Sequence, residues 1–258
     1  MIYRSPFRVF VSVIRALFLR EINTRISMGK TGLFWTFFEP FFQTFLFVMI
    51  HASISQGSSF DMVVFMASGF IPFNMFRAIL SSSTGAFIAN KGLFSYKQVK
   101  PIDTILARAL LELFMIIIIA SIFLLLGFIL DYNEYLPKNI LMVIVAYCWL
   151  WVFSVGIGLI LSIGGTFFIS ISKIVNLLSF ALLFLSAVFY PLIYIPVEIQ
   201  KLLLFNPLVH FMEMIHGFYM MELNTQYVNY QYMLMWTIFP WFIGLWLYKS
   251  FEKKVISV

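Results

Sequence analysis

Four charged residues stand out because they lie within or at the edge of long apolar stretches: Glu39, Arg77, Arg108 and Glu112. An ionisable side chain is costly in membrane hydrocarbon, so residues of this kind are candidates for function. Arg108 and Glu112 are four residues apart, which favours an ion pair on one helix face. Arg77 has no such neighbour, and two roles stay open. Either Arg77 lines a water-filled pathway for an anionic substrate, or it forms an ion pair with Glu39.

Other site chemistry is missing from the sequence. There is no GxxxxGK[ST] phosphate-binding loop, so no nucleotide site is visible in this sequence. HExxH and GxSxG motifs are absent, and the single cysteine, Cys148, excludes a thiolate metal cluster. The histidines His51, His210 and His216 do not have the spacing of metal ligands. We therefore expect a chain that is not an enzyme and that holds no metal or cofactor.

Apolar helices must position the charged residues. Hydrophobic residues make up 62% of the 258 residues, and uncharged runs such as 114–130 recur. About 20 helical residues span the hydrocarbon core, and the alternation expected of a barrel strand is absent. The expected fold is an all-α polytopic membrane protein. Its six transmembrane helices are predicted at about 33–54, 62–88, 103–130, 139–163, 174–195 and 232–249.

These spans are predicted to form one membrane domain over residues 1–258. Residues 1–32 hold a cytoplasmic interfacial helix, 33–249 the six-helix region and 250–258 a cytoplasmic tail. Of the 17 basic residues, only Lys138 and Lys201 fall on the outer side, and Arg77 and Arg108 fall in or beside spans. The other thirteen share one side: Arg4, Arg8, Arg15, Arg20, Arg25, Lys30, Lys91, Lys97, Lys100, Lys173, Lys249, Lys253 and Lys254. The positive-inside rule then places both termini in the cytoplasm.

The N-terminal segment 3–28 is amphipathic. At the helical period, one arc holds Phe7, Phe10, Val11, Ile14, Leu17 and Phe18. This pattern predicts a helix in the membrane interface, with its apolar face in lipid. The pattern weakens where Glu21 and Arg25 fall on the apolar side. The alternative is a generic basic tail that only orients the chain.

The loop 89–101 is basic but is not purely polar. Leu93, Phe94 and Tyr96 stand between Lys91 and Lys97. Apolar residues among lysines favour a surface on which another protein docks. The alternative is a short loop that rests on lipid headgroups.

The outer segment 196–231 is apolar but carries Asn206, Pro207, His210 and Glu213. Pro207 divides it into pieces shorter than a span, which predicts a re-entrant or interfacial hairpin between the fifth and sixth transmembrane helices. Such a hairpin could close the outer end of a pathway, so these four residues are candidates for an outer gate. An ordinary pair of interfacial helices is the alternative.

Small residues recur at every fourth position in two places. The stripes are Ser154, Gly158, Ser162 and Thr166, and Ser81, Gly85 and Ala89. Stripes of this kind permit close approach of helices, either within one subunit or between two.

Several stretches together resemble a known family. They are NKGLFSYKQVKPIDTILARALLE (90–112), FLREINTR (18–25) followed by GLFWTFFEP (32–40), SGFIPFNMF (68–76) and FNPLVHFMEM (205–214). The sequence is thereby similar to the inner-membrane permeases of capsular polysaccharide ABC exporters, the KpsM type of the ABC-2 class. It departs from the family pattern at His216, where members often carry an arginine, and in 27–31, where Lys30 is the one basic residue.

The resemblance implies a permease subunit of the inner membrane that forms a homodimer and binds two cytoplasmic ATPase subunits, which would hold ATP and Mg²⁺. It implies export of a long, usually anionic, lipid-linked capsule polymer together with periplasmic and outer-membrane export proteins. Membrane lipids surround the chain, and no nucleic acid is expected as a partner. In this setting the candidates to line the polymer path are Arg77, Trp35, Phe38 and Glu39. Trp35 and Phe38 are included because aromatic faces pack on sugars. For the aromatic residues, lipid contact is the alternative.

Three other functions stay open. The chain could serve an exporter of the O-antigen or teichoic-acid type. It could be a membrane-embedded transferase on lipid-linked sugars, but its cytoplasmic acids, Glu21, Asp103 and Glu252, are scattered. A secondary transporter would usually be larger and show internal repeats.

Overall fold

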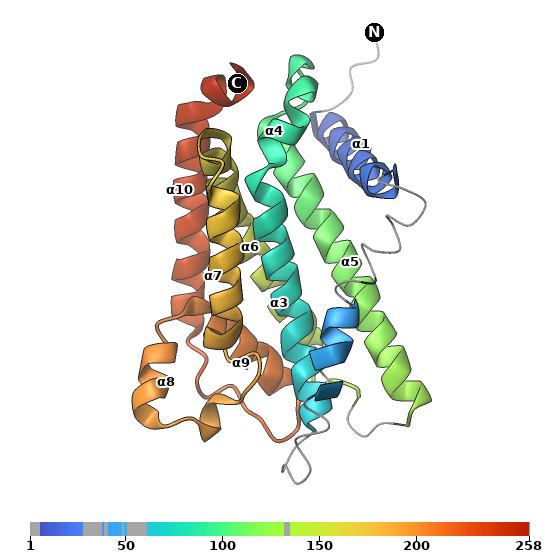
Figure 1. Ribbon diagram of the computed structural model, residues 1–258, viewed down its shortest axis with the longest axis vertical. Helices are drawn as coiled ribbons and strands as arrows, with labels where there is room; N and C mark the ends of the chain where they lie inside the picture. Colours follow the sequence, from blue (N-terminus) through green and yellow to red (C-terminus); the bar gives the residue numbers. More distant parts are fainter. Residues whose placement is uncertain are drawn as a thin grey trace.

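The computed structural model describes residues 6–27, 38, 41–47, 49–50, 61–131 and 135–257. These residues form helices, short 3₁₀ turns and connecting segments, with no strand among them. Five helices run lengthwise: α3 (Met62–Thr84), α5 (Pro101–Ile129), α6 (Ile140–Phe167), α7 (Ile171–Leu185) and α10 (Tyr230–Ser257). Figure 1 shows α3 between α5 on one side and α7 and α10 on the other. The predicted all-α fold is confirmed.

Shorter elements lie at the two ends of the bundle. One end carries α1 (Pro6–Ser27), α4 (Ala86–Asn90) and the 3₁₀ turn η1 (Lys91–Ser95). The other carries η2 (Leu192–Tyr194), α8 (Val197–Leu203) and α9 (Pro207–Tyr219). The last turns of α10 lie at the same end as α1 and α4 (Figure 1). The parts of the chain nearest its two termini therefore share one end of the molecule.

Within the described residues, three helices are long and apolar enough to cross a membrane: α3, α5 and α6. They confirm three of the predicted apolar helices, at 62–88, 103–130 and 139–163. The predicted helix at 33–54 lies mostly outside the described residues, of which 38, 41–47 and 49–50 are helical. The helix at 232–249 is longer than predicted, because α10 continues to Ser257.

The predicted helix at 174–195 is wrong in its second half. Helix α7 ends at Leu185, and Ala187 has a φ of 56°, which a continuing helix does not permit. Asn206 holds the end of α7 by donating to the Leu185 carbonyl (3.0 Å) and to the Ser186 hydroxyl (2.9 Å). The apolar residues after Ser186 therefore belong to the segments that surround α9, and apolar composition alone did not reveal the turn.

Helix α3 is the centre of the core. It packs against α5, α6, α7 and α9, and its Phe70, Phe73 and Phe76 are almost fully buried. Small residues let α6 approach α3 closely. A Cβ on Gly158 would lie 2.6 Å from the Ser83 hydroxyl, and a Cβ on Gly165 would overlap the Thr84 carbonyl. The stripe that contains Gly158 therefore packs within the subunit.

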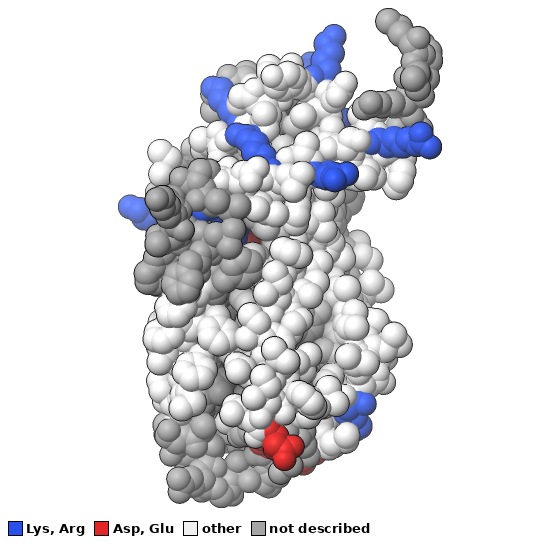
Figure 2. Space-filling view, turned by 90° about the vertical axis from the view of Figure 1, so that its right-hand side faces the viewer, with Lys and Arg blue, Asp and Glu red and all other residues white. Residues whose placement is uncertain are grey.

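Charges are separated along the bundle. Figure 2 shows most of the visible lysines and arginines gathered around one end of the molecule, whereas the other end shows acidic side chains with a basic one nearby. A broad uncharged band lies between them, on the face that Figure 2 displays. This distribution matches the pattern that a membrane imposes on the proteins that cross it.

Candidate functional site

The loop that follows α4 presents an aromatic residue at the basic end of the molecule. The large aromatic side chain of Tyr96 is 64% exposed. In the sequence Tyr96 stands between Lys91 and Lys97. Lys91 and Lys97 are exposed as well, and Leu93 is half-buried. The structure thus brings Leu93, Tyr96 and Lys97 together along one cavity, and Lys91 precedes them at the start of η1.

Phe94 lies differently. Its side chain is 8% exposed and belongs to an apolar cluster with Phe87, Ile105 and Val255. The Phe87 and Phe94 rings meet edge to face at 6.4 Å. Phe94 therefore anchors the loop to α5 and α10, and does not offer its side chain to a partner. The sequence alone does not distinguish it from its exposed neighbours.

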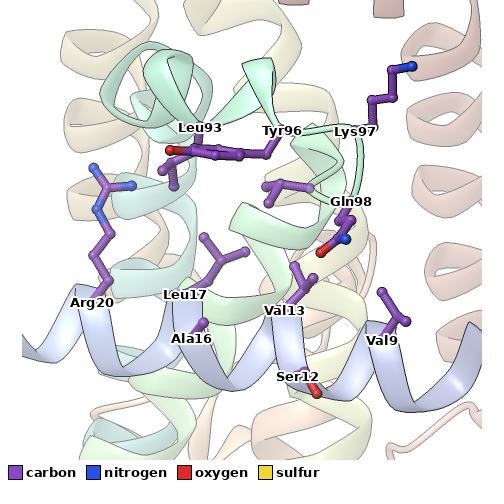
Figure 3. A pocket seen from close by; sticks show the side chains of 11 residues that line it. Val9, Ser12, Val13, Ala16, Leu17, Arg20, Leu93, Tyr96, Lys97 and Gln98 are labelled. Carbon is purple, nitrogen blue, oxygen red and sulfur yellow. The ribbon is translucent and has the colours of Figure 1, made fainter. Parts of the chain in front are cut away.

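A cavity of about 500 Å³ separates this loop from α1. Val9, Val13 and Leu17 of α1 line one wall, and Leu93 and Tyr96 line the other. Figure 3 shows Val13 and Leu17 pointing from α1 toward the loop, with Arg20 at one end of the cavity. The loop and the N-terminal helix therefore enclose a largely apolar cavity, with the basic residues Arg20 and Lys97 among those that line it.

Helix α1 confirms the predicted amphipathic helix at 3–28 within a few residues. Its apolar arc is divided between two environments. Leu17 is buried in the protein with Val13 and Ala107, whereas Phe7 and Phe10 remain exposed. The prediction that the whole arc faces lipid is thus wrong for Leu17, because α5 and the 91–99 segment cover that side of the helix.

Two ion pairs join α1 to α5, and they correct the predicted pair between Arg108 and Glu112. The Arg108 Nε lies 3.0 Å from Oε1 of Glu21, and the Arg25 guanidinium bonds to the Glu112 carboxylate. The side chains of all four residues are at least three-quarters buried. Glu21 and Arg25, which weakened the amphipathic pattern, are therefore among the residues that attach α1 to the bundle.

Polar contacts also connect α3 with the helical segment 41–47. Arg77 Nη2 donates to Oε1 of Gln43 at 3.2 Å, and Asn74 Nδ2 lies 3.5 Å from Oγ1 of Thr44. Arg77 is partly buried and lies within a helix that is otherwise uncharged. Trp35 and Glu39 lie outside the described residues, so a pair between Arg77 and Glu39 stays untested. Phe38, in contrast, stacks on Phe42 with ring centroids 5.2 Å apart.

One further polar contact extends this face toward α7. The Ser81 hydroxyl lies 3.4 Å from Oδ1 of Asn176, and both side chains are exposed. Arg77 and Ser81 are four residues apart, so they share one side of α3. Exposed amides are poorly accommodated by lipid, so this polar face of α3 is a candidate site. Gln43 and Asn176 were not predicted as site residues, because both are neutral amides and do not stand out in an apolar run as a charged residue does.

The candidate outer-gate residues lie together at the opposite end, where they bind backbone groups. Asn206 caps α9 by accepting from the Leu208 amide (3.0 Å), and Pro207 occupies the first turn. The His210 Nδ1 accepts from the Asn229 amide (3.2 Å), and Glu213 accepts from the Leu192 amide (3.3 Å). These contacts fold the segments before and after α9 around it.

His216 lies on α9, six residues after His210. Its side chain is fully buried, and its ring stacks on Phe65 with centroids 3.9 Å apart. Gly69 makes room for it, since a Cβ there would lie 2.6 Å from the His216 Nε2. At this position the chain has an aromatic contact between α9 and α3.

Helices that can cross a membrane, with polar residues between them and a basic loop exposed at one end, define a polytopic membrane protein. The chain belongs to the ABC-2 type transporter family, whose model matches residues 12–220.

Curated relatives match it almost from end to end. The chain is 37% identical over 257 residues to the polysialic acid transport protein KpsM of Escherichia coli, covering 98% of this chain and 99% of the relative. It is 30% identical to the capsule polysaccharide export inner-membrane protein BexB of Haemophilus influenzae, covering 94% and 92%. The inner-membrane protein CtrC of Neisseria meningitidis, also named for capsule polysaccharide export, is 29% identical with the same coverage.

Proposed function

We propose that this chain is the permease subunit of an ATP-driven exporter that moves lipid-linked capsular polysaccharide across the bacterial inner membrane. The observation that carries the proposal is the similarity over 98% of the chain to a protein named for polysialic acid transport. Relatives named for capsule polysaccharide export point to the same substrate class. Permeases of O-antigen or teichoic-acid type exporters are the nearest alternative.

The membrane arrangement proposed for this function has six spans and two cytoplasmic termini. The described helices α3, α5 and α6 supply three spans, and we assign the others to α7, α10 and the segment around 41–47. Helix α1 and the end of α10 lie at the same end of the bundle, as an even number of spans requires (Figure 1). The gathering of basic residues at that end favours its assignment to the cytoplasm.

The ATPase is proposed to dock at this basic end, where it would hold ATP and Mg²⁺. Tyr96 is the residue best placed to contact it, because its side chain is exposed by 64% between Lys91 and Lys97. Aromatic residues at the centre of an interface often carry much of its binding energy. Leu93 adds apolar surface beside Tyr96, and Phe94 supports the loop from within.

The polymer path is proposed to follow the polar face of α3. Arg77 would attract carboxylate or phosphate groups of an anionic polymer, and Gln43 holds its guanidinium in place. Ser81 and Asn176 continue this face with groups that can exchange hydrogen bonds with sugar hydroxyls. Phe38 would add an aromatic contact, and Trp35 and Glu39 remain candidates from the sequence.

The hairpin at the opposite end is proposed as the outer gate of this path. Asn206, Pro207, His210 and Glu213 would hold it closed through the backbone contacts described above. Because α9 has 13 residues, it is too short to cross the membrane. A closed hairpin of this kind would keep ions from leaking through an empty path.

Two copies of the chain are proposed to enclose the path, since exposed polar groups on α3 and α7 need cover from lipid. The exporter would also contact periplasmic and outer-membrane export proteins. The rival function as a transferase gains no support from the acids near the cytoplasmic end. Glu21 bonds to Arg108, Asp103 accepts from the Lys100 amide, and Glu252 accepts from the Tyr248 hydroxyl.

Purification tests this proposal. The chain, tagged at its C-terminus and extracted in a mild detergent, should retain a nucleotide-binding subunit in a complex with two copies of each. Mass measurement of the complex and ATP hydrolysis by it are the readouts. A chain that purifies alone, and instead transfers sugar from a lipid carrier, would support the transferase.

A further inference from the structure

The two ion pairs between α1 and α5 are arranged so that they define one relative position of the helices. Along α1 the order is Glu21 then Arg25, and along α5 it is Arg108 then Glu112. The partners are separated by 87 residues in both pairs. Both pairs therefore correspond to one and the same position of α1 along α5. Each acid faces a base and each base faces an acid.

A different position of α1 would be penalised. If α1 moved along α5 by one helical turn, about 5.4 Å, either Arg25 would face Arg108 or Glu21 would face Glu112. Like charges would then meet in a largely buried interface. Buried polar and ionic groups are best attested as devices that specify register, and not as sources of stability.

The same network reaches the loop proposed to dock the ATPase. Asn90 is the last residue of α4 and directly precedes that loop. It is 2% exposed, and its side chain accepts from Arg20 of α1 (2.8 Å) and donates toward Glu21 (3.4 Å). Arg108 in turn donates to the Ser82 carbonyl in the last turn of α3 (2.6 Å). Four elements therefore meet at these few side chains: α1, α3, α4 and α5.

We infer that Glu21, Arg25, Asn90, Arg108 and Glu112 are positioning residues for transport, which lock α1 to α5 and to the docking loop so that these elements move as one body. The inference rests on the proposed function, because the movement would be driven by the ATPase at the loop. Through this lock, displacement of the loop would shift α1 at the cytoplasmic entrance of the path. The residues contact neither polymer nor nucleotide, and act through the helices that they join.

The pair to test is Arg25 and Glu112, which form an ion pair with each other. Arg108 and Glu21 are less suitable, because Arg108 also bonds to the Ser82 carbonyl and Glu21 also accepts from Asn90. The double variant R25Q/E112Q removes both charges and leaves none stranded, so it should fold and assemble. The exchange R25E/E112R keeps the pair with its polarity reversed; both ion pairs still form together only at the native position, although a shift by one turn no longer brings like charges together. K249Q, which removes an exposed charge from α10, serves as the control.

The readouts are surface polysaccharide and ATP hydrolysis, each expressed per assembled complex. R25Q/E112Q should hydrolyse ATP but export roughly tenfold less, R25E/E112R should export within about twofold of the parent, and K249Q should be unchanged. A merely structural pair would change the amount of complex and leave export per complex constant. Parental export per complex in R25Q/E112Q, or a similar loss in R25E/E112R, would overturn the inference. Failure of the parent chain to bind an ATPase or to support export would instead overturn the proposed function.

Discussion

Arg77 of α3 and Gln43 of the segment 41–47 are joined by a hydrogen bond of 3.2 Å inside the apolar part of the bundle. The contact gives the partly buried guanidinium a neutral partner, so the charge of Arg77 is held in position but is not cancelled by Gln43. A charge that is oriented in this way can attract an anionic polymer. This relationship favours a path role for Arg77.

We expect Arg77→Ala to reduce surface polysaccharide at native expression by about tenfold or more, because the barrier for an anion in a low-dielectric region rises when the cation is removed. Arg77→Lys should restore part of the export. Gln43→Ala should have a smaller effect than Arg77→Ala, since it leaves the charge in place. Normal surface polysaccharide with Arg77→Ala would rule out the path role.

A double substitution separates that role from pairing with Glu39. If Arg77 and Glu39 form a structural pair, replacing Arg77 alone strands the carboxylate of Glu39. Compared with that single variant, Glu39→Gln with Arg77→Gln should then restore both the amount of folded protein and export. If Arg77 serves the path, the double variant should restore the protein without export. Quantitative immunoblotting of membranes and surface polysaccharide assays distinguish the two results.

Tyr96→Asp and Phe94→Asp should have different consequences, although the residues are two positions apart. Phe94→Asp buries a carboxylate among apolar residues, at a cost of several kcal/mol, and should lower the amount of folded permease. Tyr96→Asp changes an exposed residue and should leave the permease folded while releasing the ATPase. Co-purification of the ATPase with a tagged permease measures the effect.

Tyr194→Asp is the matched control, because Tyr194 is 60% exposed at the opposite end of the bundle. It should retain the ATPase. Equal retention by Tyr96→Asp would show that Tyr96 is not part of the docking surface.

Gly165→Ala should destabilise the contact between α6 and α3. Its Cβ would overlap the backbone carbonyl of Thr84, which cannot move aside as a side chain does. Overpacking of this kind typically costs about 1–3 kcal/mol, and it should appear as a lower melting temperature of the purified protein. Gly85→Ala provides the control, since no atom lies within 4 Å of the position of its Cβ. Equal melting temperatures for the two variants would argue against the close α3–α6 packing.

The sequence predicted the helical class and three of the apolar helices because length and hydropathy depend on local composition. It also predicted the amphipathic helix at α1. It did not predict the end of α7 at Leu185, because the following residues are as apolar as the helix itself and the turn is held by Asn206, 21 residues away from Leu185.

The sites were harder to predict because their partners are distant along the chain. Arg108 and Glu112 have the spacing of a helical pair, and yet each bonds to a residue of α1 that lies 87 positions earlier. Local spacing cannot reveal a competing partner of this kind. The burial of Phe94 was hidden for the same reason, since α10 contributes to its cluster more than 150 residues later.

The proposed orientation can be tested with fusions. Alkaline phosphatase fused after Val258 should be inactive, and a fluorescent protein at the same place should fluoresce, because each reports the compartment in which it folds. An active phosphatase at this site would contradict a cytoplasmic C-terminus and would place the docking loop on the wrong side of the membrane for an ATPase.

The location of the polymer in cells that lack this chain tests the central claim most directly. Cells without it should accumulate polysaccharide in the cytoplasm and display none at the surface, and expression of the chain should restore surface display. Fractionation and labelling with a polymer-specific antibody or lectin give both quantities in the same culture. Normal surface display without the chain, or loss of the polymer from every compartment, would contradict a role in export; the latter result would indicate a role in synthesis.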